Sequence, residues 1–405
     1  MLKKPKVYVW CQFFYPELIS TGQVVTELFE QLSKQVQVEV HCAQPTIKKS
    51  SKVLHILDYR GIKIVRLWSS TFPKISIIGK LINQITYSSS LVLRALFLPS
   101  RSRVNVFTDP FFLPLLLFIL YPLKKFRYTI TLFDLYPETL VKNNILLENS
   151  LLYRILDGLT NKVYANASNV ITIGRCMQKI VSSRSIMWKK EPVFIPIWCD
   201  TDNVRKKTLP QDYFRKQWNI EESCFVVGYS GNLAKFHPIE TFLQSAVILK
   251  DKNDIKFIFV GEGAKKAAAE KFCRDNKLLN CHFQTYVDRK HLGSLLYSFD
   301  CGLVGLNKNQ TGLSVPSKTI GLMSAGVPVV ACVNEQSETA LIIKENQCGL
   351  IVQPDCSRSL ANGILSLQQC RKKCEQFSQN GLSAVAESFN IESISNSYFK
   401  ILMQS

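Results

Sequence analysis

The chain has 405 residues, 46% of them hydrophobic, which is enough to bury two ordinary cores. It contains no run of 18 apolar residues, and its N-terminus shows no apolar run followed by a cleavage site, so we expect neither a transmembrane helix nor a signal peptide. The thirteen cysteines are scattered and form no CxxC pair, which favours reduced thiols over disulfides or zinc ligands. We therefore expect a cytoplasmic protein of two domains.

The positive charge is concentrated in the first half of the chain. Residues 1–200 carry 26 lysines and arginines against 12 aspartates and glutamates, a net charge of +14, whereas the remainder carries +5. A basic protein can bind nucleic acid, but this chain has no nucleic-acid-binding motif, and its basic residues flank apolar segments rather than exposed aromatic ones. We expect no nucleic-acid partner.

Seven short β-rich runs alternate with helical patterns in the first half. Several are continuously apolar, as is typical of strands buried on both faces of a parallel sheet. The runs are 6–14, 36–44, 61–68, 103–109, 128–134, 169–174 and 192–198. This alternation predicts a doubly wound α/β domain.

Two apolar segments of this domain end in basic residues. In 72–103, Ile78, Leu81, Ile82, Ile85, Val92 and Leu96 recur at helical spacing, and Lys74, Lys80, Arg94, Arg101 and Arg103 surround them. An amphipathic period alone fits a helix packed on a sheet as well as one docked on an anionic membrane. For 111–127, the thirteen-residue length of the apolar part favours a helix packed on the sheet.

The second half repeats the alternation of strands and helices. Its expected strands lie in 224–231, 255–263, 281–287, 301–306, 327–332 and 349–354. The polar segment 199–211 ends near a proline and is typical of a linker. We expect an N-terminal domain over 1–198, a C-terminal domain over 212–382 and a final helix over 383–405.

The segment 315–331, VPSKTIGLMSAGVPVVA, is the most informative about function. Ser317 suits a helix N-cap and Gly326 suits the position just past a helix end, so we expect a short helix between them. Lys318 then lies in the first turn, where the helix dipole disfavours a cation. Its presence is explained if a phosphate lies between Lys318 and the free amides; a solvated lysine on an ordinary helix is the alternative.

Five motifs together resemble the family 4 glycosyltransferases of the GT-B architecture, in particular the colanic acid and fucosamine transferases of bacterial surface-polysaccharide synthesis. They occur in the family's order, at 13–28, 131–140, 228–246, 257–266 and 316–331. The resemblance implies two Rossmann-like domains that face a cleft, with a final helix that crosses back onto the first domain. It also implies a retaining reaction that needs no metal or other cofactor.

The resemblance places the donor diphosphate on several loops. In the second domain, Gly231 follows a strand, and the family's arginine and lysine positions fall on Asn232 and His237; we expect Lys235 to supply the missing charge. The expected donor-binding residues are Gly22, Gln23, Gly231, Asn232, Lys235, Gly261, Glu262, Tyr286, Val287, Pro316, Ser317, Lys318 and Thr319. Tyr286 and Val287 would lie beside the base.

Catalysis requires a group near the acceptor hydroxyl. Asp134 ends an apolar strand and is expected to bind that hydroxyl or act as an auxiliary base, and Glu138 is the competing candidate. Many relatives carry two glutamates with seven residues between them, but the equivalent positions here are Leu313 and Gly321. No HxH, HExxH or DxD pattern indicates a catalytic metal.

The sequence thus predicts a transferase that moves a sugar from a nucleoside diphosphate, expected to be UDP, to a glycan or polyprenyl-diphosphate-linked acceptor of lipopolysaccharide or capsule synthesis. Its expected partners are the nucleotide sugar, the acceptor and the anionic inner face of the membrane. A non-hydrolysing UDP-sugar 2-epimerase remains open, as does a non-catalytic nucleotide-binding scaffold subunit.

Overall fold

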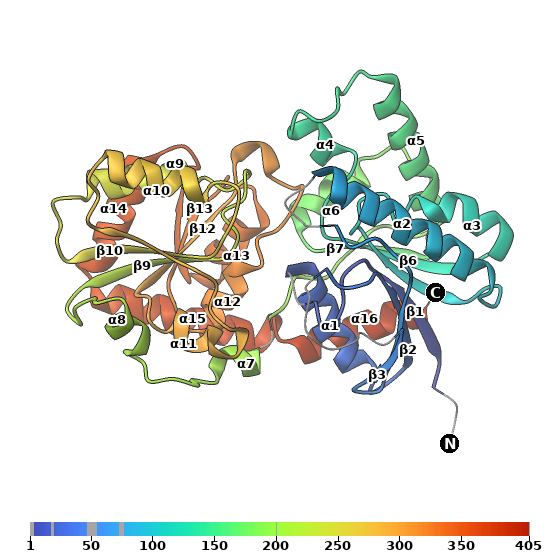
Figure 1. The fold of residues 1–405 in the computed structure, drawn as a ribbon, viewed down its shortest axis with the longest axis horizontal. Helices are drawn as coiled ribbons and strands as arrows, with labels where there is room; N and C mark the ends of the chain where they lie inside the picture. The colour runs from blue at the N-terminus through green and yellow to red at the C-terminus, as the bar shows by residue number, and fades with distance from the viewer. Residues whose placement is uncertain (1–3, 18–19, 47–54, 73–76, 200, 405) are drawn as a thin grey trace. The chain divides into compact units, whose positions relative to one another are not determined.

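The computed structural model describes residues 4–17, 20–46, 55–72, 77–199 and 201–404 (Figure 1). The chain divides into two compact units, each built around a parallel or mostly parallel sheet with flanking helices. Unit 1 consists of Met1–Pro196 and Ile391–Ser405, and unit 2 consists of Ile197–Asn390. The expected pair of Rossmann-like α/β domains is confirmed.

The sheet of unit 1 has eight strands in the order β3-β4-β2-β1-β5-β6-β7-β8. All neighbours pair in parallel except β3 and β4. The strands are β1 (Lys6–Trp10), β2 (Gln37–Cys42), β3 (Ile56–Tyr59), β4 (Ile62–Arg66), β5 (Arg103–Phe107), β6 (Arg127–Leu132), β7 (Asn169–Thr172) and β8 (Val193–Phe194). The central strands are almost wholly buried, which explains their continuous apolar runs.

The edge strand β3 was not expected from the sequence. It joins β4 through Arg60 and Gly61, which both have positive φ, at 50° and 78°. Positive φ at both central residues is the mark of a type I′ hairpin turn, which usually contains Asn-Gly or Asp-Gly. Arginine at the first position gives no such signal, and the β3 side chains are at most half-buried.

Helices of unit 1 pack on its sheet and carry the two segments with basic ends. They are α1 (Ser20–Leu32), α2 (Ile77–Leu96), α3 (Leu116–Lys124), α4 (Glu138–Lys142), α5 (Leu151–Asn166), α6 (Arg175–Ser182) and α16 (Ile391–Met403). The last helix, α16, lies along α1, where the Gln35 side chain donates a hydrogen bond to Asn396 Oδ1 at 3.0 Å. Asn169 of β7 also donates to the Ile401 carbonyl at 3.2 Å, and Tyr398 is completely buried. The final helix therefore completes the core of unit 1.

The sheet of unit 2 is parallel throughout, in the order β11-β10-β9-β12-β13-β14. Its strands are β9 (Phe225–Ser230), β10 (Ile255–Val260), β11 (Cys281–Gln284), β12 (Cys301–Gly305), β13 (Val329–Cys332) and β14 (Gly349–Val352). Its helices are α7 (Thr201–Arg205), α8 (Tyr213–Gln217), α9 (Ile239–Ile248), α10 (Lys266–Asp275), η1 (Arg289–His291), α11 (Leu292–Leu296), η2 (Lys308–Gln310), α12 (Lys318–Ser324), α13 (Glu338–Asn346), α14 (Ser357–Gln368) and α15 (Arg371–Ser388).

Two boundaries differ from the expected ones. The segment 199–211 is not a free linker, because it contains α7 and packs on α11: Thr208 Oγ1 donates to the Lys290 carbonyl at 2.9 Å, and the Leu209 amide donates to Ser294 Oγ at 3.0 Å. The segment 383–405 is not one helix, because α15 ends within unit 2 and a break at 389–390 precedes α16. Polar composition and helical periodicity alone did not reveal these contacts.

Candidate active site

In unit 1, the strand β6 leads into the first catalytic candidate. Phe133 and Asp134 follow the end of this strand. The backbone amide of Phe133 donates a hydrogen bond to Thr108 Oγ1 at 3.1 Å, and that of Asp134 donates to the same oxygen at 3.3 Å. Burial raises the pKa of Asp134 to about 6. A carboxyl group with such a pKa is ionised at neutral pH yet poised to accept a proton, as a general base requires.

A second carboxylate, Asp109, follows the neighbouring strand β5 and was missed in the sequence. Burial and the charges of Asp134 and Asp109 together raise the pKa of Tyr136, so both carboxylates act on that phenol. Because β5 and β6 are parallel neighbours, their carboxyl ends lie at one edge of the sheet. The signal was present, since FTDP at 107–110 and FDLYP at 133–137 both place an aspartate just after a strand.

The competing candidate, Glu138, is held in an ion-pair cluster. Arg184 contacts Glu138 Oε1 and also bonds Asp157 Oδ1 at 2.7 Å and Asn161 Oδ1 at 2.6 Å. The Arg184 side chain is only 9% exposed, so this cluster is well shielded from water. Through Arg184, Glu138 at the start of α4 is linked to α5, and its catalytic role stays a prediction.

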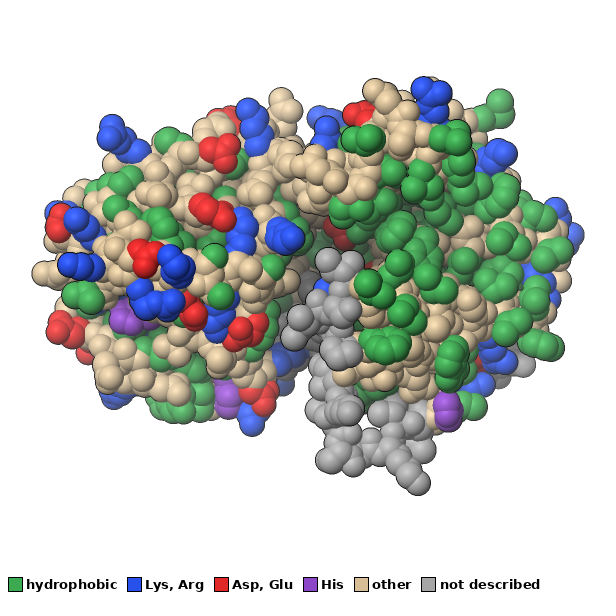
Figure 2. Space-filling view, turned by 45° about the horizontal axis from the view of Figure 1, so that its top comes forward, with side chains coloured by type: hydrophobic (Ala, Val, Ile, Leu, Met, Phe, Trp, Pro, Cys, Tyr) green, Lys and Arg blue, Asp and Glu red, His purple; other side chains and the backbone are tan. Residues whose placement is uncertain are grey.

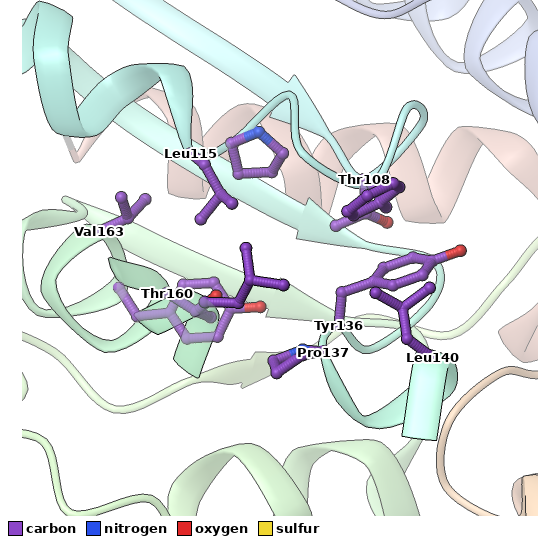
Figure 3. Close-up of a pocket in the computed structure, with 11 residues that line it drawn as sticks. Thr108, Leu115, Tyr136, Pro137, Leu140, Thr160 and Val163 are labelled. Carbon is purple, nitrogen blue, oxygen red and sulfur yellow. The ribbon is translucent and has the colours of Figure 1, made fainter. Parts of the chain in front are cut away.

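A narrow apolar cavity lies behind Tyr136. Leu115, Tyr136, Leu140, Thr160 and Val163 line it, and their side chains surround a common space (Figure 3). Its volume is about 20 Å³, which is room for about one water molecule. A cavity of this volume is too small to hold a sugar.

The expected donor loop of unit 1 is tightly packed. A Cβ atom at Gly22 would lie 2.7 Å from the Glu17 carbonyl oxygen and 2.9 Å from Phe13 Cβ, so only glycine fits there. The Glu17 carboxylate accepts hydrogen bonds from the amide and hydroxyl of Thr46, at 2.9 and 2.6 Å. Gln23 donates to Glu27 at 3.0 Å. The contact of Gly22 and Gln23 with a donor stays a prediction.

In unit 2, the structure brings Gly231 and Lys318 together. Gly231 follows β9 with φ +135°, and a Cβ atom there would lie 2.4 Å from Lys318 Cε. Lys318 Nζ lies 5.0 Å from the centre of the Tyr229 ring. Burial lowers the pKa of Lys318 to about 8, and no carboxylate of the described residues offsets that effect. Lys318 is half-buried, so the site holds a partly desolvated cation without an anionic partner in the described chain.

The helix that carries Lys318 is as short as expected. Ser317 occupies the N-cap position, but its side chain makes no capping hydrogen bond. Gly326 has φ +64° and ends the helix: its amide donates to the Met323 carbonyl, and the Val327 amide donates to that of Leu322. This is the Schellman pattern. Pro316 and Ser317 are half-buried, but the Thr319 side chain is buried, so only its backbone could reach a ligand.

The loops after β9 and β10 are joined by backbone hydrogen bonds. The Gly231 amide donates to the Val260 carbonyl at 2.9 Å, and the Leu233 amide donates to the Glu262 carbonyl at 2.9 Å. A Cβ atom at Gly261 would lie 2.1 Å from the Gly231 carbonyl oxygen. The Glu262 carboxylate points away into an ion pair with Lys266 at 2.6 Å. Asn232 is exposed beside this junction.

His237 is a structural residue of the same loop. It is buried, and its Nδ1 lies 2.8 Å from the Asn232 carbonyl and 2.7 Å from the Tyr229 hydroxyl. Burial and the nearby charge of Lys318 lower the pKa of His237 to about 3, so the ring is neutral at physiological pH. His237 therefore cannot replace a cation of the relatives.

Lys235 lies on the surface of unit 2. Its side chain is exposed, and its carbonyl accepts a hydrogen bond from Asn307 Nδ2 at 3.4 Å. The expected role of Lys235 in a phosphate clamp stays a prediction. Lys318 is the cation that the structure places directly against the Gly231 loop.

The two residues expected beside the base line a groove at the end of β11. Tyr286 is exposed and Val287 is half-buried. The groove has a volume of about 270 Å³, and its lining residues are Leu209, Tyr213, Phe214, Gln217, Trp218, Gln284, Thr285, Tyr286, Val287 and His291. Such an aromatic lining suits a flat heterocycle.

The positions of the missing glutamate pair differ in character. Leu313 is buried, whereas a Cβ atom at Gly321 would fit without a clash, in ordinary contact 3.9 Å from Leu296 Cδ1. Within the described ranges, no three histidine, cysteine, aspartate or glutamate side chains are grouped to hold a metal ion. Of the helices described, none is long and apolar enough to cross a bilayer.

Comparison with known proteins agrees with this arrangement. Residues 210–383 match the family of glycosyl transferases group 1. WbjE of Pseudomonas aeruginosa, described as a probable glycosyltransferase, is 27% identical over 62% of this chain and 63% of its own length. WcaI of Escherichia coli K12, assigned to colanic acid biosynthesis as a glycosyl transferase, is 25% identical over 49% of each chain. The alignments thus span about half to three fifths of these relatives.

Structural similarity extends over both units. Anabaena Alr3699/HepE, solved in complex with UDP-glucose, superposes with a TM-score of 0.75 at 15% identity, over 99% of this chain and all of that one. The fold is therefore GT-B, as the motifs implied. Within unit 2, residues 210–383 are similar to the glycosyl transferases group 1 family, and the relatives WbjE and WcaI are described as glycosyltransferases.

Proposed function

We propose that this protein transfers a sugar from a nucleoside diphosphate to a hydroxyl group. The observation that carries the proposal is Lys318, a partly desolvated cation held against the Gly231 loop with no described carboxylate to balance it. Burial of an unpaired charge is costly, and an incoming anion offsets that cost. A donor diphosphate placed between Lys318 and the loop amides supplies such an anion.

The reaction follows from charge development at that diphosphate. When the bond between the sugar and the diphosphate breaks, negative charge grows on the leaving phosphate, and Lys318 stabilises it without reorganisation. Asp134 serves as the auxiliary base that takes the proton of the acceptor hydroxyl. We assign this role to Asp134 rather than Glu138, because Glu138 is bound by Arg184. The resemblance to family 4 supports retention of configuration and a reaction without a metal.

The donor proposed is a UDP-sugar, and the acceptor a glycan or polyprenyl-diphosphate-linked sugar of a surface polysaccharide such as lipopolysaccharide or capsule. UDP is supported by the HepE complex with UDP-glucose. The acceptor class is supported by the description of WcaI. The groove at Tyr286 and Val287 would receive the uracil. We place the protein at the cytoplasmic side of the membrane, where such acceptors are built.

The test separates nucleotide binding from transfer. Thermal unfolding is followed with a panel of nucleotide sugars and with UDP, UMP and uridine. A ligand at 100 times its dissociation constant stabilises the native state by about 2.7 kcal/mol, which is an easily measured shift. We expect stabilisation by UDP and one UDP-sugar, weaker stabilisation by UMP and little by uridine, because the second phosphate faces Lys318. An equal response to uridine and UDP would contradict the proposed site.

A non-catalytic nucleotide-binding subunit is the second candidate. It is favoured by Leu313 and Gly321, which stand where many relatives have glutamates. UDP release is therefore measured with the stabilising donor in the presence and absence of a lipid-linked glycan acceptor. Release that requires the acceptor supports the transferase, whereas tight UDP binding without release under either condition supports the scaffold.

A further inference from the structure

Helix α2 has two apolar faces, of which only one belongs to the core. Tyr87, Leu91 and Ala95 are completely buried against the sheet. A second stripe, composed of Ile78, Leu81, Ile82, Ile85, Leu93 and Leu96, is exposed along the length of the helix. Ile78, for example, is 71% exposed. The helical spacing seen in the sequence therefore describes a solvent-facing stripe rather than a core-facing one.

The exposed apolar surface continues onto neighbouring helices. Helix α3 packs against both α2 and α5, and all three carry exposed side chains. We define the apolar face as the α2 stripe together with Phe97, Phe118, Ile119, Leu123, Ile145, Leu147, Leu151, Leu152 and Ile155. Hydrophobic side chains spread over this part of unit 1 in the space-filling view (Figure 2). Monomeric soluble proteins rarely expose apolar patches of this extent without a binding partner.

Basic side chains surround the apolar face. Lys80, Arg101, Lys125 and Lys162 are exposed on the same helices or beside them. Lys162 Nζ lies 5.6 Å from the centre of the Phe118 ring, so charge and apolar surface are directly adjacent. Of the nearby acids, Glu138 and Asp157 pair with Arg184, whereas Glu148 is exposed beside Leu147, so the four bases outnumber the one exposed carboxylate. The rim of the face is therefore positive.

We propose that the apolar face docks unit 1 on an anionic lipid bilayer. Its α2 stripe, on a helix of 20 residues, extends about 30 Å and can lie in the plane of the interface. The basic rim is complementary to anionic headgroups, and the apolar side chains enter the acyl boundary. The sequence favoured packing of helix α3 on the sheet alone, but the helix contributes to both the core and the apolar face. Leu117 and Leu120 are buried, whereas Ile119 and Leu123 are exposed. This inference stands on the surface itself and does not depend on the proposed transfer reaction.

The experiment is co-sedimentation of the full chain with vesicles of phosphatidylcholine alone or with about one third phosphatidylglycerol. We expect binding mainly to the anionic vesicles, weaker at 1 M than at 0.1 M salt, because the Debye length shortens from about 10 Å to about 3 Å. Replacing Leu81, Ile85, Phe97 and Phe118 with Gln should lower partitioning at least about tenfold. Replacing Lys80, Arg101, Lys125 and Lys162 with Gln should lower it at least about tenfold on anionic vesicles only.

A matched control uses exposed apolar residues outside the face. Ile248→Gln with Leu279→Gln alters two exposed side chains of unit 2 and should leave vesicle binding unchanged. All variants change exposed side chains, and equal unfolding midpoints confirm that they fold. The proposal is overturned if the wild-type chain does not sediment with anionic vesicles, or if the apolar variant sediments as well as the wild type. It is also overturned if light scattering shows a dimer that the apolar substitutions dissociate while no variant binds vesicles.

Discussion

The two units share the doubly wound α/β topology, but the residues at the carboxyl ends of their strands differ in charge. In unit 1, β5 and β6 lead to the carboxylates Asp109 and Asp134. In unit 2, β9 and β10 lead to Gly231 and Gly261, and Lys318 lies against the first of them. Ligands of parallel α/β sheets bind at these strand ends, so the residues placed there, and not the common winding, decide what each unit can bind.

Burial acts on both charged groups in the same direction, toward the neutral form. It raises the pKa of Asp134 to about 6 and lowers the pKa of Lys318 to about 8. The carboxylate can therefore accept a proton readily, and the ammonium group can be stabilised by an anion. This difference supports the proposal that unit 1 binds the acceptor hydroxyl and unit 2 binds the donor phosphate.

The largest effect on turnover is expected from substitution of Asp134 in unit 1. Asp134→Asn keeps the size of the side chain but removes the base, so turnover should fall by about 10² to 10⁴ in UDP-release assays with donor and acceptor. The wild-type rate should also fall as the pH drops below about 6, because the Asp134 carboxylate is then protonated. UDP affinity serves as the control and should not change.

The alternative, in which Glu138 rather than Asp134 is the base, predicts a different result for Glu138→Gln. Glu138→Gln should lower the unfolding midpoint, because it weakens the contact that holds Arg184, while turnover per folded molecule is retained. An inactive Glu138→Gln with unchanged midpoint, alongside an active Asp134→Asn, would reverse the roles of the two residues.

Lys318 of unit 2 should mainly affect the affinity for UDP, whereas Asp134 should mainly affect turnover. Lys318→Met keeps the apolar stem against Gly231 and Tyr229 but removes the charge. A charge-assisted bond to phosphate contributes roughly 1.5 to 3 kcal/mol, so calorimetry should show UDP affinity reduced about tenfold to a hundredfold. Uridine, which has no phosphate, should bind equally to both proteins; an equal loss for uridine would indicate a damaged groove instead.

The pH dependence of UDP binding gives a second test of whether Lys318 contacts the phosphate. The lowered pKa means that free Lys318 loses its proton above about pH 8, and binding UDP then requires proton uptake. Affinity should fall by up to about tenfold per pH unit above 8. Lys318→Met should remove this dependence. A wild-type affinity that stays constant between pH 7 and pH 9.5 would show that Lys318 does not face the phosphate.

The smallest effect is expected at Lys235. Its side chain is exposed, and exposed charge pairs contribute about 0 to 1 kcal/mol, so Lys235→Ala should reduce UDP affinity by no more than about fivefold. His237→Asn, in the same loop, tests whether the neutral ring acts only by holding the loop, in which case the unfolding midpoint falls together with affinity. A loss at Lys235 as large as that at Lys318 would mean that two cations share the phosphate.

The strands of both units could be predicted because parallel sheets need continuous apolar runs. Each of the thirteen expected strands overlaps an observed one, but β3 was missed because its side chains are half-exposed and its turn begins with Arg60. The stripe on α2 had the right period, yet period alone cannot distinguish a core from a solvent-facing surface when both sides of a helix are apolar. That distinction required the burial of Tyr87 and Leu91.

At the site, local sequence identified Lys318 and Gly231 but not their contact. They are 87 positions apart, and only the sheet brings them together. In the same way, the ion pair between Glu138 and Arg184 distinguishes two carboxylates that look equivalent in TLFDLYPETL, and the assignment of the base to Asp134 stays a prediction. Strand-end position predicts where a residue lies; its partners from distant elements decide what it does.

The return of α16 to unit 1 makes unit 2 an insertion within unit 1. The chain leaves unit 1 after Pro196 and re-enters it at Ile391, so both junctions must be kept for unit 1 to regain its final helix. A fragment that stops at residue 196 lacks the partner that covers α1 and Asn169. If unit 2 binds the donor as proposed, chimeras designed to exchange donor specificity would replace residues 197–390 as one block and leave the last fifteen residues with their original host.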